Sequence, residues 1–278
     1  MKNFIKELFK KYILTFEDKI FYKSIKKIMF SSHLEKVFSS SFFNTFKKPD
    51  TFTISNKAKV LVISPHPDDE AIAMGGTLRQ EISVGSEISI IYCTHKKASI
   101  RGKEAKSLCD RNNFSSLFLE MEDGNIQINN EIIGVISDYI NEIKPNKIYL
   151  PLFCDDHDDH KRCVELFYKF LQNTKNSQVT GIWCYQVYGL VPATHLVDIS
   201  KQIREKKELI NYYKSEEKKR HWAHWVLGSN AYQSRFLRVK NKKSFAESYL
   251  FFEIEQFRKL CKIYFSKKKI IYSNRNYR

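Results

Sequence analysis

The sequence predicts an α/β fold in which a mostly parallel sheet is covered by helices on both faces. Short apolar runs rich in β-branched residues alternate along the chain with amphipathic helical segments, the pattern of strand–helix–strand units. Within the apolar runs hydrophobic and polar residues do not alternate, which indicates strands that are buried on both faces. Parallel strands joined by right-handed crossovers therefore account for the series.

The predicted elements follow one another through the first half of the chain. Strands are expected at residues 59–64, 87–93, 117–121 and 147–152. Helices with one apolar face are expected at residues 71–82, 101–112 and 131–143. The loop after the first strand contains no Gly-x-Gly-x-x-Gly sequence, so a dinucleotide site is not supported.

Length and composition narrow the class further. The chain has 278 residues, of which 42% are hydrophobic and 28% charged, which suits a large folded domain and excludes a wholly disordered chain. Apolar runs are far shorter than the roughly 18 residues of a membrane span, and lysines interrupt the N-terminus where a secretory signal would be apolar. The six cysteines form no Cys-x-x-Cys pair, so buried thiols in a reducing cytoplasm are expected.

The net charge of +16 is concentrated at the two ends of the chain. Residues 1–50 carry +6 and are expected to form a basic amphipathic helical N-terminal extension, and residues 256–278 carry +8 as a basic C-terminal tail. The central domain, residues 51–255, carries only +2, which argues against nucleic-acid binding. The ends are either solvated, or contact an anionic membrane at its inner face, or pack on the domain or on a second subunit of a homo-oligomer.

The first polar cluster follows the first predicted strand as Pro65-His66-Pro67-Asp68-Asp69-Glu70. Ligands of open α/β sheets bind at the carboxyl ends of the strands. Capping of the next helix would explain one carboxylate, but not a histidine together with three acids. A metal site is therefore the better interpretation.

The second polar cluster, Asp155-Asp156-His157-Asp158-Asp159-His160, follows the fourth predicted strand. Taken alone it would suit a charged surface turn. Because both clusters follow strands of one parallel sheet, we expect them to meet at one edge. His66, Asp69 and His160 would then offer two nitrogens and one carboxylate, a set typical of catalytic Zn²⁺, with Fe²⁺ as the alternative.

These motifs resemble the PIG-L/LmbE family of zinc-dependent N-deacetylases. The resemblance begins with Ile63-Ser64-Pro65-His66-Pro67-Asp68-Asp69-Glu70 and Gly75-Gly76-Thr77-Leu78. It continues through Arg101-x-x-Glu104, Asp123-Gly124, His157-x-Asp159-His160, Val197-Asp198-Ile199 and Lys206-Lys207. It covers the chain from residue 58 to residue 215, or as far as 250, and implies a Rossmann-like sheet.

The resemblance also implies roles for individual residues. His66, Asp69 and His160 correspond to the metal ligands, Asp68 to the general base and His157 to a second catalytic group. We expect Asp159 to hold His157 in its tautomer and keep it cationic, so that it donates to the developing oxyanion. Glu70 either orients a ligand or caps the helix. Arg101 and Asp123 match substrate-binding positions, although a helix-start ion pair and a turn explain them equally well.

The sequence departs from the family pattern in two places. Asp158 stands where proline is frequent, which adds negative charge but moves no ligand. Thr94-His95-Lys96-Lys97 stands where Asp-Gly is common, in a loop that the resemblance places beside the sugar, so this departure bears on substrate choice. His95 is expected in a surface loop. Tyr185 and Tyr188 are expected to pack in a strand, and the aromatic segment 221–225 to be core or a subunit contact rather than a glycan or lipid groove.

Together these observations predict a zinc-dependent hydrolase that removes an acetyl group from an N-acetylglucosamine-type sugar in glycoconjugate or lipid-linked saccharide biosynthesis. Two alternatives stay open. A soluble deacetylase of a thiol-precursor or nucleotide sugar would not need the basic ends. A non-catalytic metal-binding scaffold would not need Asp68 and His157.

Overall fold

The computed structural model describes residues 48–173, 179, 181–189, 193–237 and 243–267. Their strands form one sheet in the order β1-β7-β8-β6-β5-β2-β3-β4. The strands are β1 (Asp50–Phe52), β2 (Lys59–Ser64), β3 (Glu87–Thr94), β4 (Ser115–Met121), β5 (Lys147–Pro151), β6 (Gly181–Tyr185), β7 (His195–Asp198) and β8 (Ala246–Glu253). β8 runs antiparallel to β6 and β7, whereas the other neighbours are parallel.

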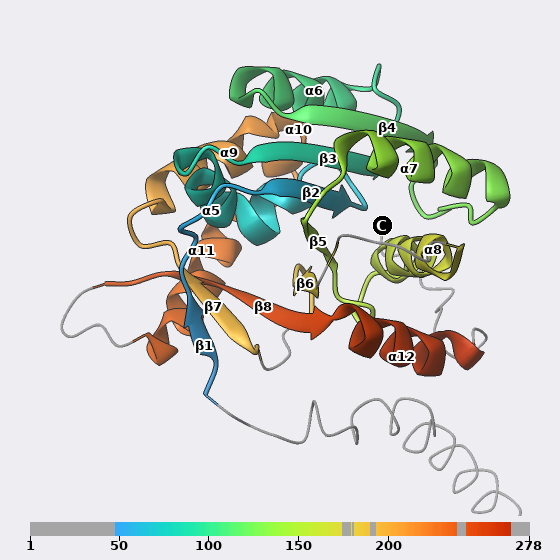
Figure 1. Ribbon diagram of the computed structural model, residues 1–278. Helices are drawn as coiled ribbons and strands as arrows, with labels where there is room; N and C mark the ends of the chain where they lie inside the picture. Colours follow the sequence, from blue (N-terminus) through green and yellow to red (C-terminus); the bar gives the residue numbers. More distant parts are fainter. Residues whose placement is uncertain (1–47, 174–178, 180, 190–192, 238–242, 268–278) are drawn as a thin grey trace, which may run out of the picture.

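Helices cover both faces of the sheet (Figure 1). α7 (Asn130–Ile143), α8 (Asp158–Asn173) and α12 (Ile254–Tyr264) pack on one face. α5 (Asp69–Ser83), α6 (Ile100–Asn112), α9 (Ile203–Tyr212) and α11 (Trp222–Gln233) pack on the other, and the short α10 (Lys214–Glu217) lies between α9 and α11 in the chain. In the described part of the chain, no helix combines the length and apolar character needed to cross a membrane.

The α/β prediction is confirmed. Every strand and helix expected between residues 59 and 152 is present, with ends that differ by at most two residues. β7, β8 and the antiparallel direction of β8 were not expected from the sequence. The strand expected around Tyr185 is β6, although β6 ends before Tyr188. All six cysteines are free, and five of them are buried.

The expected C-terminal boundary is wrong, because α12 belongs to the folded domain. Phe257, Leu260, Cys261 and Tyr264 are buried against the face that α8 covers. A tail beginning at residue 256 would leave this amphipathic helix without its apolar contacts. The N-terminal extension, residues 1–47, and the last residues, 268–278, lie outside the described residues.

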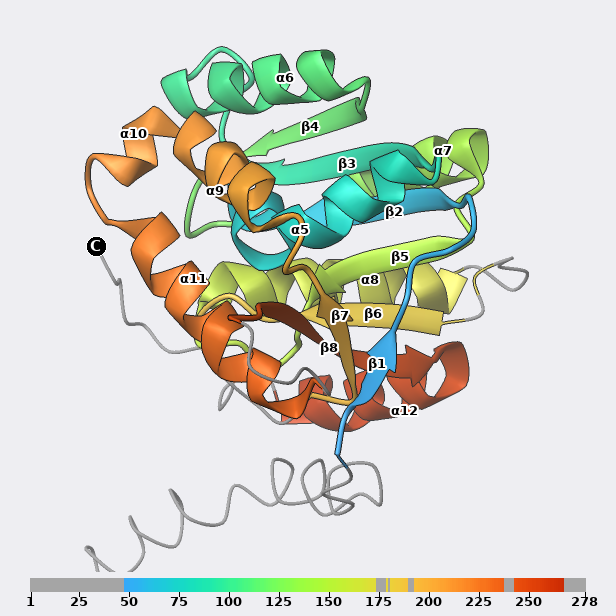
Figure 2. The ribbon, with the colours of Figure 1, turned by 90° about the vertical axis from the view of Figure 1, so that its left-hand side faces the viewer.

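The order of the strands places a switch in chain direction at the end of β2. The chain leaves β2 toward β3 and β4, and then returns to β5 on the other side of β2. At such a switch in direction the loops diverge and open a crevice outside the carboxyl ends of the strands. In Figure 2, β2, β3 and β4 point toward the side on which α10 and α11 lie.

Candidate active site

The loop after β2 is tightly hydrogen-bonded around the first cluster. The Ser64 hydroxyl donates to the main-chain oxygen of His66 at 2.7 Å, and the main-chain N–H of His66 donates to Oδ2 of Asp69 at 2.9 Å. Asp68 has a φ of 124°, a value that residues other than glycine rarely adopt. Such backbone strain persists only where the surroundings impose it, and it is concentrated at functional sites.

Glu70 supports this loop from inside the protein. Its carboxylate is fully buried and accepts hydrogen bonds from Ser64 Oγ at 3.3 Å, the main-chain N–H of Asp68 at 3.2 Å and the hydroxyl of Tyr213 at 2.5 Å. Burial raises the pKa of Glu70 to about 7, although the hydrogen bond from Tyr213 opposes this. Of its two expected roles, orienting the ligand-bearing loop is the one these contacts suit.

His66, Asp69 and His160 bring their ligand atoms together, within 4.8 Å of one another. Nδ1 of His66 and Nε2 of His160 lie 3.2 Å and 3.3 Å from the same oxygen, Oδ2 of Asp69. A tetrahedral ion about 2.1 Å from each ligand would separate ligand atoms by roughly 3.4 Å. The three predicted ligands therefore fit a metal such as Zn²⁺.

Each of the two histidines has a carboxylate at its other nitrogen. Oδ2 of Asp159 lies 3.1 Å from Nε2 of His66, and Oδ2 of Asp155 lies 3.5 Å from Nδ1 of His160. Neither ring nitrogen of the buried His160 has a partner in hydrogen-bond geometry among the described residues. Burial alone would lower the pKa of His160, but Asp69 and Asp155 raise it to about 9. In metal sites, carboxylates commonly orient the histidines that bind the ion. The carboxylates around these two histidines also supply the negative charge that a bound cation would balance.

Asp68 lies beside the three predicted ligands and pairs with a different partner. Its buried carboxylate pairs with Arg101, whose Nη2 is 2.5 Å from Oδ2. Burial raises the pKa of Asp68 to about 6, while the guanidinium of Arg101 lowers it. Such a carboxylate is ionised at neutral pH and still basic enough to accept a proton.

The expected relation between His157 and Asp159 needs correction. The carboxylate of Asp159 contacts His66 and accepts the main-chain N–H of Gly124 at 2.7 Å. It is instead the main-chain N–H of Asp159 that donates to Nδ1 of His157, at 3.1 Å. This bond sets the tautomer, leaving the proton of the neutral ring on Nε2. Burial and the neighbouring His66 and His160 lower the pKa of His157, so it is a neutral donor rather than the expected cation.

Arg101 and Asp123 both reach the site, Arg101 through an ion pair at the start of α6, which is the alternative that the sequence left open for it. Arg101 lies between Asp68 and Glu216, with its Nε 3.9 Å from Oε1 of Glu216. Oδ1 of Asp123 lies 3.2 Å from Nε2 of His66, and the Asp123 side chain is 58% exposed. Exposure at the edge of the ligand cluster leaves Asp123 accessible to substrate. Its role and that of Arg101 in substrate binding stay predictions.

Two residues given no role by the sequence analysis also lie at the site. The ring centroids of His95 and His66 are 6.1 Å apart. His95 therefore lies beside the ligand cluster and not on a distant part of the surface. Tyr188 lies beyond β6 rather than in a strand, and stacks on His157 with centroids 5.6 Å apart. Tyr185 packs as expected and donates from its hydroxyl to the main-chain oxygen of Ile63 at 2.8 Å. The segment that contains His95 had been singled out as a departure from the family pattern, whereas Tyr188 belongs to no motif and is revealed only by the fold.

A buried ion pair holds the helix that begins at Asp69. α5 is kinked at Met74, which has non-helical backbone angles. Lys206 Nζ donates to the main-chain oxygen of Ile72 at 2.8 Å and to Glu247 at 2.5 Å. The Glu247 carboxylate accepts the main-chain N–H groups of Gly76 and Thr77, at 2.9 and 2.7 Å. These side chains satisfy backbone groups that the kink frees.

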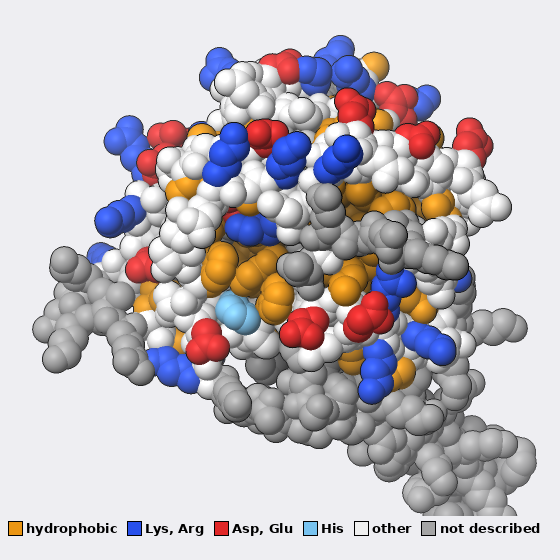
Figure 3. Space-filling view, viewed as in Figure 1, with side chains coloured by type: hydrophobic (Ala, Val, Ile, Leu, Met, Phe, Trp, Pro, Cys, Tyr) orange, Lys and Arg blue, Asp and Glu red, His pale blue; other side chains and the backbone are white. Residues whose placement is uncertain are grey.

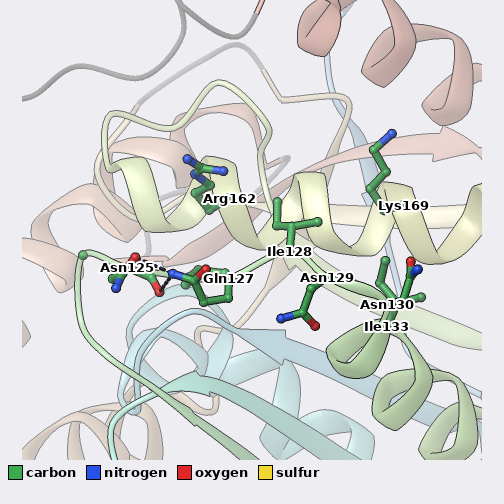
Figure 4. Close-up of a pocket in the computed structure, with 10 residues that line it drawn as sticks. Asn125, Gln127, Ile128, Asn129, Asn130, Ile133, Arg162 and Lys169 are labelled. Atoms are coloured by element: carbon green, nitrogen blue, oxygen red, sulfur yellow. Dashed lines mark hydrogen bonds between the residues drawn. The ribbon is translucent and has the colours of Figure 1, made fainter.

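A second cavity begins next to Asp123 and extends along α8 (Figure 4). It has a volume of about 360 Å³ and lies between the loop of residues 124–130 and α8. Its lining includes amide side chains of the loop, of which Gln127 donates to Asn125, together with Arg162 and Lys169 of α8. None of the predicted site residues lines it, so the candidate active site is the cluster of His66, Asp69 and His160 after β2 and β5.

A family model matches the part of the chain that carries both clusters. Residues 61–171 match PIG-L, described as GlcNAc-PI de-N-acetylase. The chain contains a PIG-L domain. This domain spans β2 to α8 and includes all the predicted site residues. A glucosamine-6-phosphate deaminase-like protein of Bacteroides thetaiotaomicron is 35% identical over 66 residues, which are 23% of this chain and only 10% of that protein.

Solved structures share the fold around the PIG-L domain. The N,N′-diacetylchitobiose deacetylase of Pyrococcus horikoshii superposes with a TM-score of 0.60 at 19% identity, covering 81% of this chain and 93% of the other. The 4-carboxy-2-hydroxymuconate hydratase of Pseudomonas putida has a TM-score of 0.57 at 14% identity, covering 69% and 95%. Because these two proteins are named for different reactions, the fold alone does not fix the chemistry.

Proposed function

We propose that this protein is a metal-dependent N-deacetylase that removes the acetyl group from an N-acetylglucosamine-type sugar. One observation carries the proposal: His66, Asp69 and His160 converge after the ends of β2 and β5, with Asp68 and His157 beside them. The description of the PIG-L family and the likeness to a chitobiose deacetylase support this reaction class. Zn²⁺ is the metal that the donor set suits best, and Fe²⁺ is the alternative.

The residues divide the hydrolysis between them. A divalent cation held by His66, Asp69 and His160 would supply a Lewis acid and an activated water at neutral pH. Asp68 accepts a proton from the attacking water. The Nε2–H of His157 donates to the acetamide oxygen as negative charge develops on it. Asp68 then returns the proton to the leaving amine, and acetate departs.

The substrate belongs to glycoconjugate or lipid-linked saccharide biosynthesis in this proposal. Arg101 and Asp123 lie where they can contact sugar hydroxyls or a phosphate. The net charge is +6 over residues 1–50 and +8 over residues 256–278. These basic ends support the proposal that the enzyme acts at the cytoplasmic face of an anionic membrane. A thiol-precursor or nucleotide sugar is the alternative substrate.

Acetate release tests the proposal. The full chain, loaded with one equivalent of Zn²⁺ or Fe²⁺, is incubated with N-acetylglucosamine, its disaccharide, a nucleotide-linked form and a lipid-linked form. We expect acetate from at least one of them, and a loss of roughly 100-fold or more in Asp68→Asn. Asp158→Asn, an acid of the second cluster that is not a predicted ligand, is the matched control and should stay within about twofold of wild type.

Measuring the metal content of each variant tells the loss of a metal ligand apart from the loss of the general base. His160→Ala should lose the metal, whereas Asp68→Asn should retain it. Absence of acetate from every substrate with metal-loaded protein would contradict the proposed reaction. Loss of metal in Asp68→Asn together with its retention in Asp69→Asn would mean that the two acids have exchanged roles.

A further inference from the structure

Aromatic rings form a continuous series from the candidate site toward the surface. Tyr188, which stacks on His157, meets Trp222 with ring centroids 5.7 Å apart, and Trp225 follows 5.8 Å further on. Trp222 is buried between them, whereas Tyr188 is 39% and Trp225 54% exposed. Two aromatic side chains therefore present ring surface to solvent beside the catalytic histidine. The sequence had favoured core or subunit contact for this segment.

A cavity of about 280 Å³ runs along these rings. Its walls come from α5, from the segment that follows β6 and from α11, which lies on the side toward which β2, β3 and β4 point (Figure 2). Ile72 and Ala73, in the first turns of the helix that begins at the ligand Asp69, belong to its lining. The cavity therefore borders the candidate site, and its volume suits a single ring better than a large ligand.

The cavity also holds an unpartnered polar atom. Asn230, which is 7% exposed and lines the cavity, donates from Nδ2 to the main-chain oxygen of Ala246 at 3.0 Å. Its Oδ1 has no hydrogen-bond partner within the described part of the chain. A buried acceptor left without a donor is unfavourable, so a ligand hydroxyl that reached it would be favoured. The guanidinium of Arg220, 5.8 Å from the Trp222 ring, adds donors at the wall.

Aromatic rings together with an unpartnered buried acceptor distinguish between two kinds of ligand for this cavity. A pyranose ring has C–H faces that pack on aromatic rings and hydroxyls at its edge that donate to a buried acceptor. An alkyl chain would cover the rings, but would leave Oδ1 of Asn230 without a donor. The lining therefore favours a sugar over an acyl chain.

We propose that this cavity is a subsite for the sugar ring joined to the N-acetylated unit, so that the substrate contains at least two sugar units. The proposal rests on the proposed function, because the metal ligands define where the acetamide lies. Tyr188 and Trp225 supply the stacking surfaces, and Asn230 accepts a hydroxyl of the second ring.

The test compares substrates with one and two rings. Values of kcat/KM are measured for N-acetylglucosamine and N,N′-diacetylchitobiose with wild type, Trp225→Ala, Trp225→Phe and Tyr232→Ala. Tyr232 is an equally exposed aromatic residue of α11 outside the cavity, at 60%, and is the matched control. We expect the disaccharide-to-monosaccharide ratio to fall at least about fivefold in Trp225→Ala, to be largely retained in Trp225→Phe and to be unaffected in Tyr232→Ala.

A binding measurement keeps this proposal separate from the proposed function. In the Asp68→Asn background, calorimetry with the disaccharide should show at least about fivefold weaker binding after Trp225→Ala. Weaker binding supports the subsite even if no sugar is deacetylated, a result that would contradict only the proposed reaction. Unaltered binding, or an equal loss of kcat/KM on both substrates, would overturn the subsite. Selective loss on an octyl N-acetylglucosaminide, with the disaccharide unaffected, would assign the cavity to an alkyl chain and also overturn it.

Discussion

Arg101 lies between two carboxylates at the site, and its contact with Asp68 ties a predicted substrate residue to the predicted base. The pair joins the start of α6 to the loop after β2. Because the guanidinium stabilises the ionised form of Asp68, it opposes the rise in pKa that burial causes. The pKa of the predicted base is therefore raised by burial and moderated by a residue 33 positions along the chain.

We expect Arg101→Gln to change the pH dependence of activity. Asp68 must be ionised to accept a proton, so activity falls as the pH falls through its pKa, which is about 6. Removing the positive charge raises that pKa, and the acidic limb of kcat/KM should move to higher pH. The measurement is a pH profile of kcat/KM, with Arg204→Gln on the exposed face of α9 as control. An acidic limb that stays in place would show that Arg101 does not tune the base.

Asp155 should determine metal affinity through His160. Its carboxylate lies 3.5 Å from Nδ1 of that ligand and also accepts the main-chain N–H of Val187 at 3.2 Å. Replacing such a carboxylate typically costs 10–100-fold in metal affinity, so we expect Asp155→Asn to weaken Zn²⁺ binding by about that factor. Competition with a chelator measures it, and the exposed neighbour Asp156→Asn is the control. Equal affinities in the two variants would exclude this role.

The kinked helix α5 is the element on which the site depends most. Gly76 is required there, because a Cβ at this position would lie 2.6 Å from Cγ2 of Ile199. The same close approach brings Lys206 and Glu247 to the backbone groups that the kink frees. The motif Gly75-Gly76-Thr77 and the distant Lys206 thus have one structural explanation. Both stabilise the kinked backbone of α5, the helix that begins at Asp69.

Lys206→Met should destabilise the fold strongly. It removes one member of a fully buried ion pair and leaves the Glu247 carboxylate without its cation, which typically costs about 3–5 kcal/mol. Urea denaturation gives the free energy of unfolding. Lys207→Met, at an exposed neighbour on the same helix, should change it by less than about 0.5 kcal/mol. Similar decreases in the free energy of unfolding in both variants would show that the buried ion pair does not contribute more to stability than an exposed lysine.

At the scale of the whole molecule, charge is distributed unevenly along the chain. Figure 3 shows Lys and Arg interspersed with Asp and Glu on the face it presents, in agreement with the +2 of residues 51–255. Most of the excess positive charge belongs to segments outside the described residues. Any electrostatic attraction to an anionic partner is therefore expected from those ends.

We expect the full chain to co-sediment with vesicles of phosphatidylcholine and phosphatidylserine at low salt. Each basic residue near such a surface contributes about 1 kcal/mol, and salt weakens the attraction by shortening the Debye length. Lys→Gln at positions 2, 6, 10 and 11 should reduce binding, whereas Lys→Gln at the exposed positions 96, 97, 103 and 207 should not. Equal binding by both variants, or binding that salt does not affect, would contradict a role for the N-terminal segment. Removal of residues 256–278 is not a valid test, because it deletes α12.

Local patterns in the sequence were sufficient for the elements between residues 59 and 152 and for naming three side chains that meet as a candidate metal site. Hydrophobic periodicity reports which residues are buried, and a polar cluster directly after a buried strand indicates a site, because both signals lie within a few residues. His66, Asp69 and His160 could be named in this way before any fold was known.

Only the tertiary structure decided which groups meet across the fold. Periodicity does not reveal strand order, so neither the pairing of β2 with β5 nor the antiparallel β8 was available from the sequence. The same holds for side-chain partners. Asp159 and Asp155 have the same acid character and similar places in the motif, yet one faces His66 and the other His160. Which carboxylate serves which histidine, and that Tyr188 covers His157, depend on packing between segments far apart in the chain, a property that no local window contains.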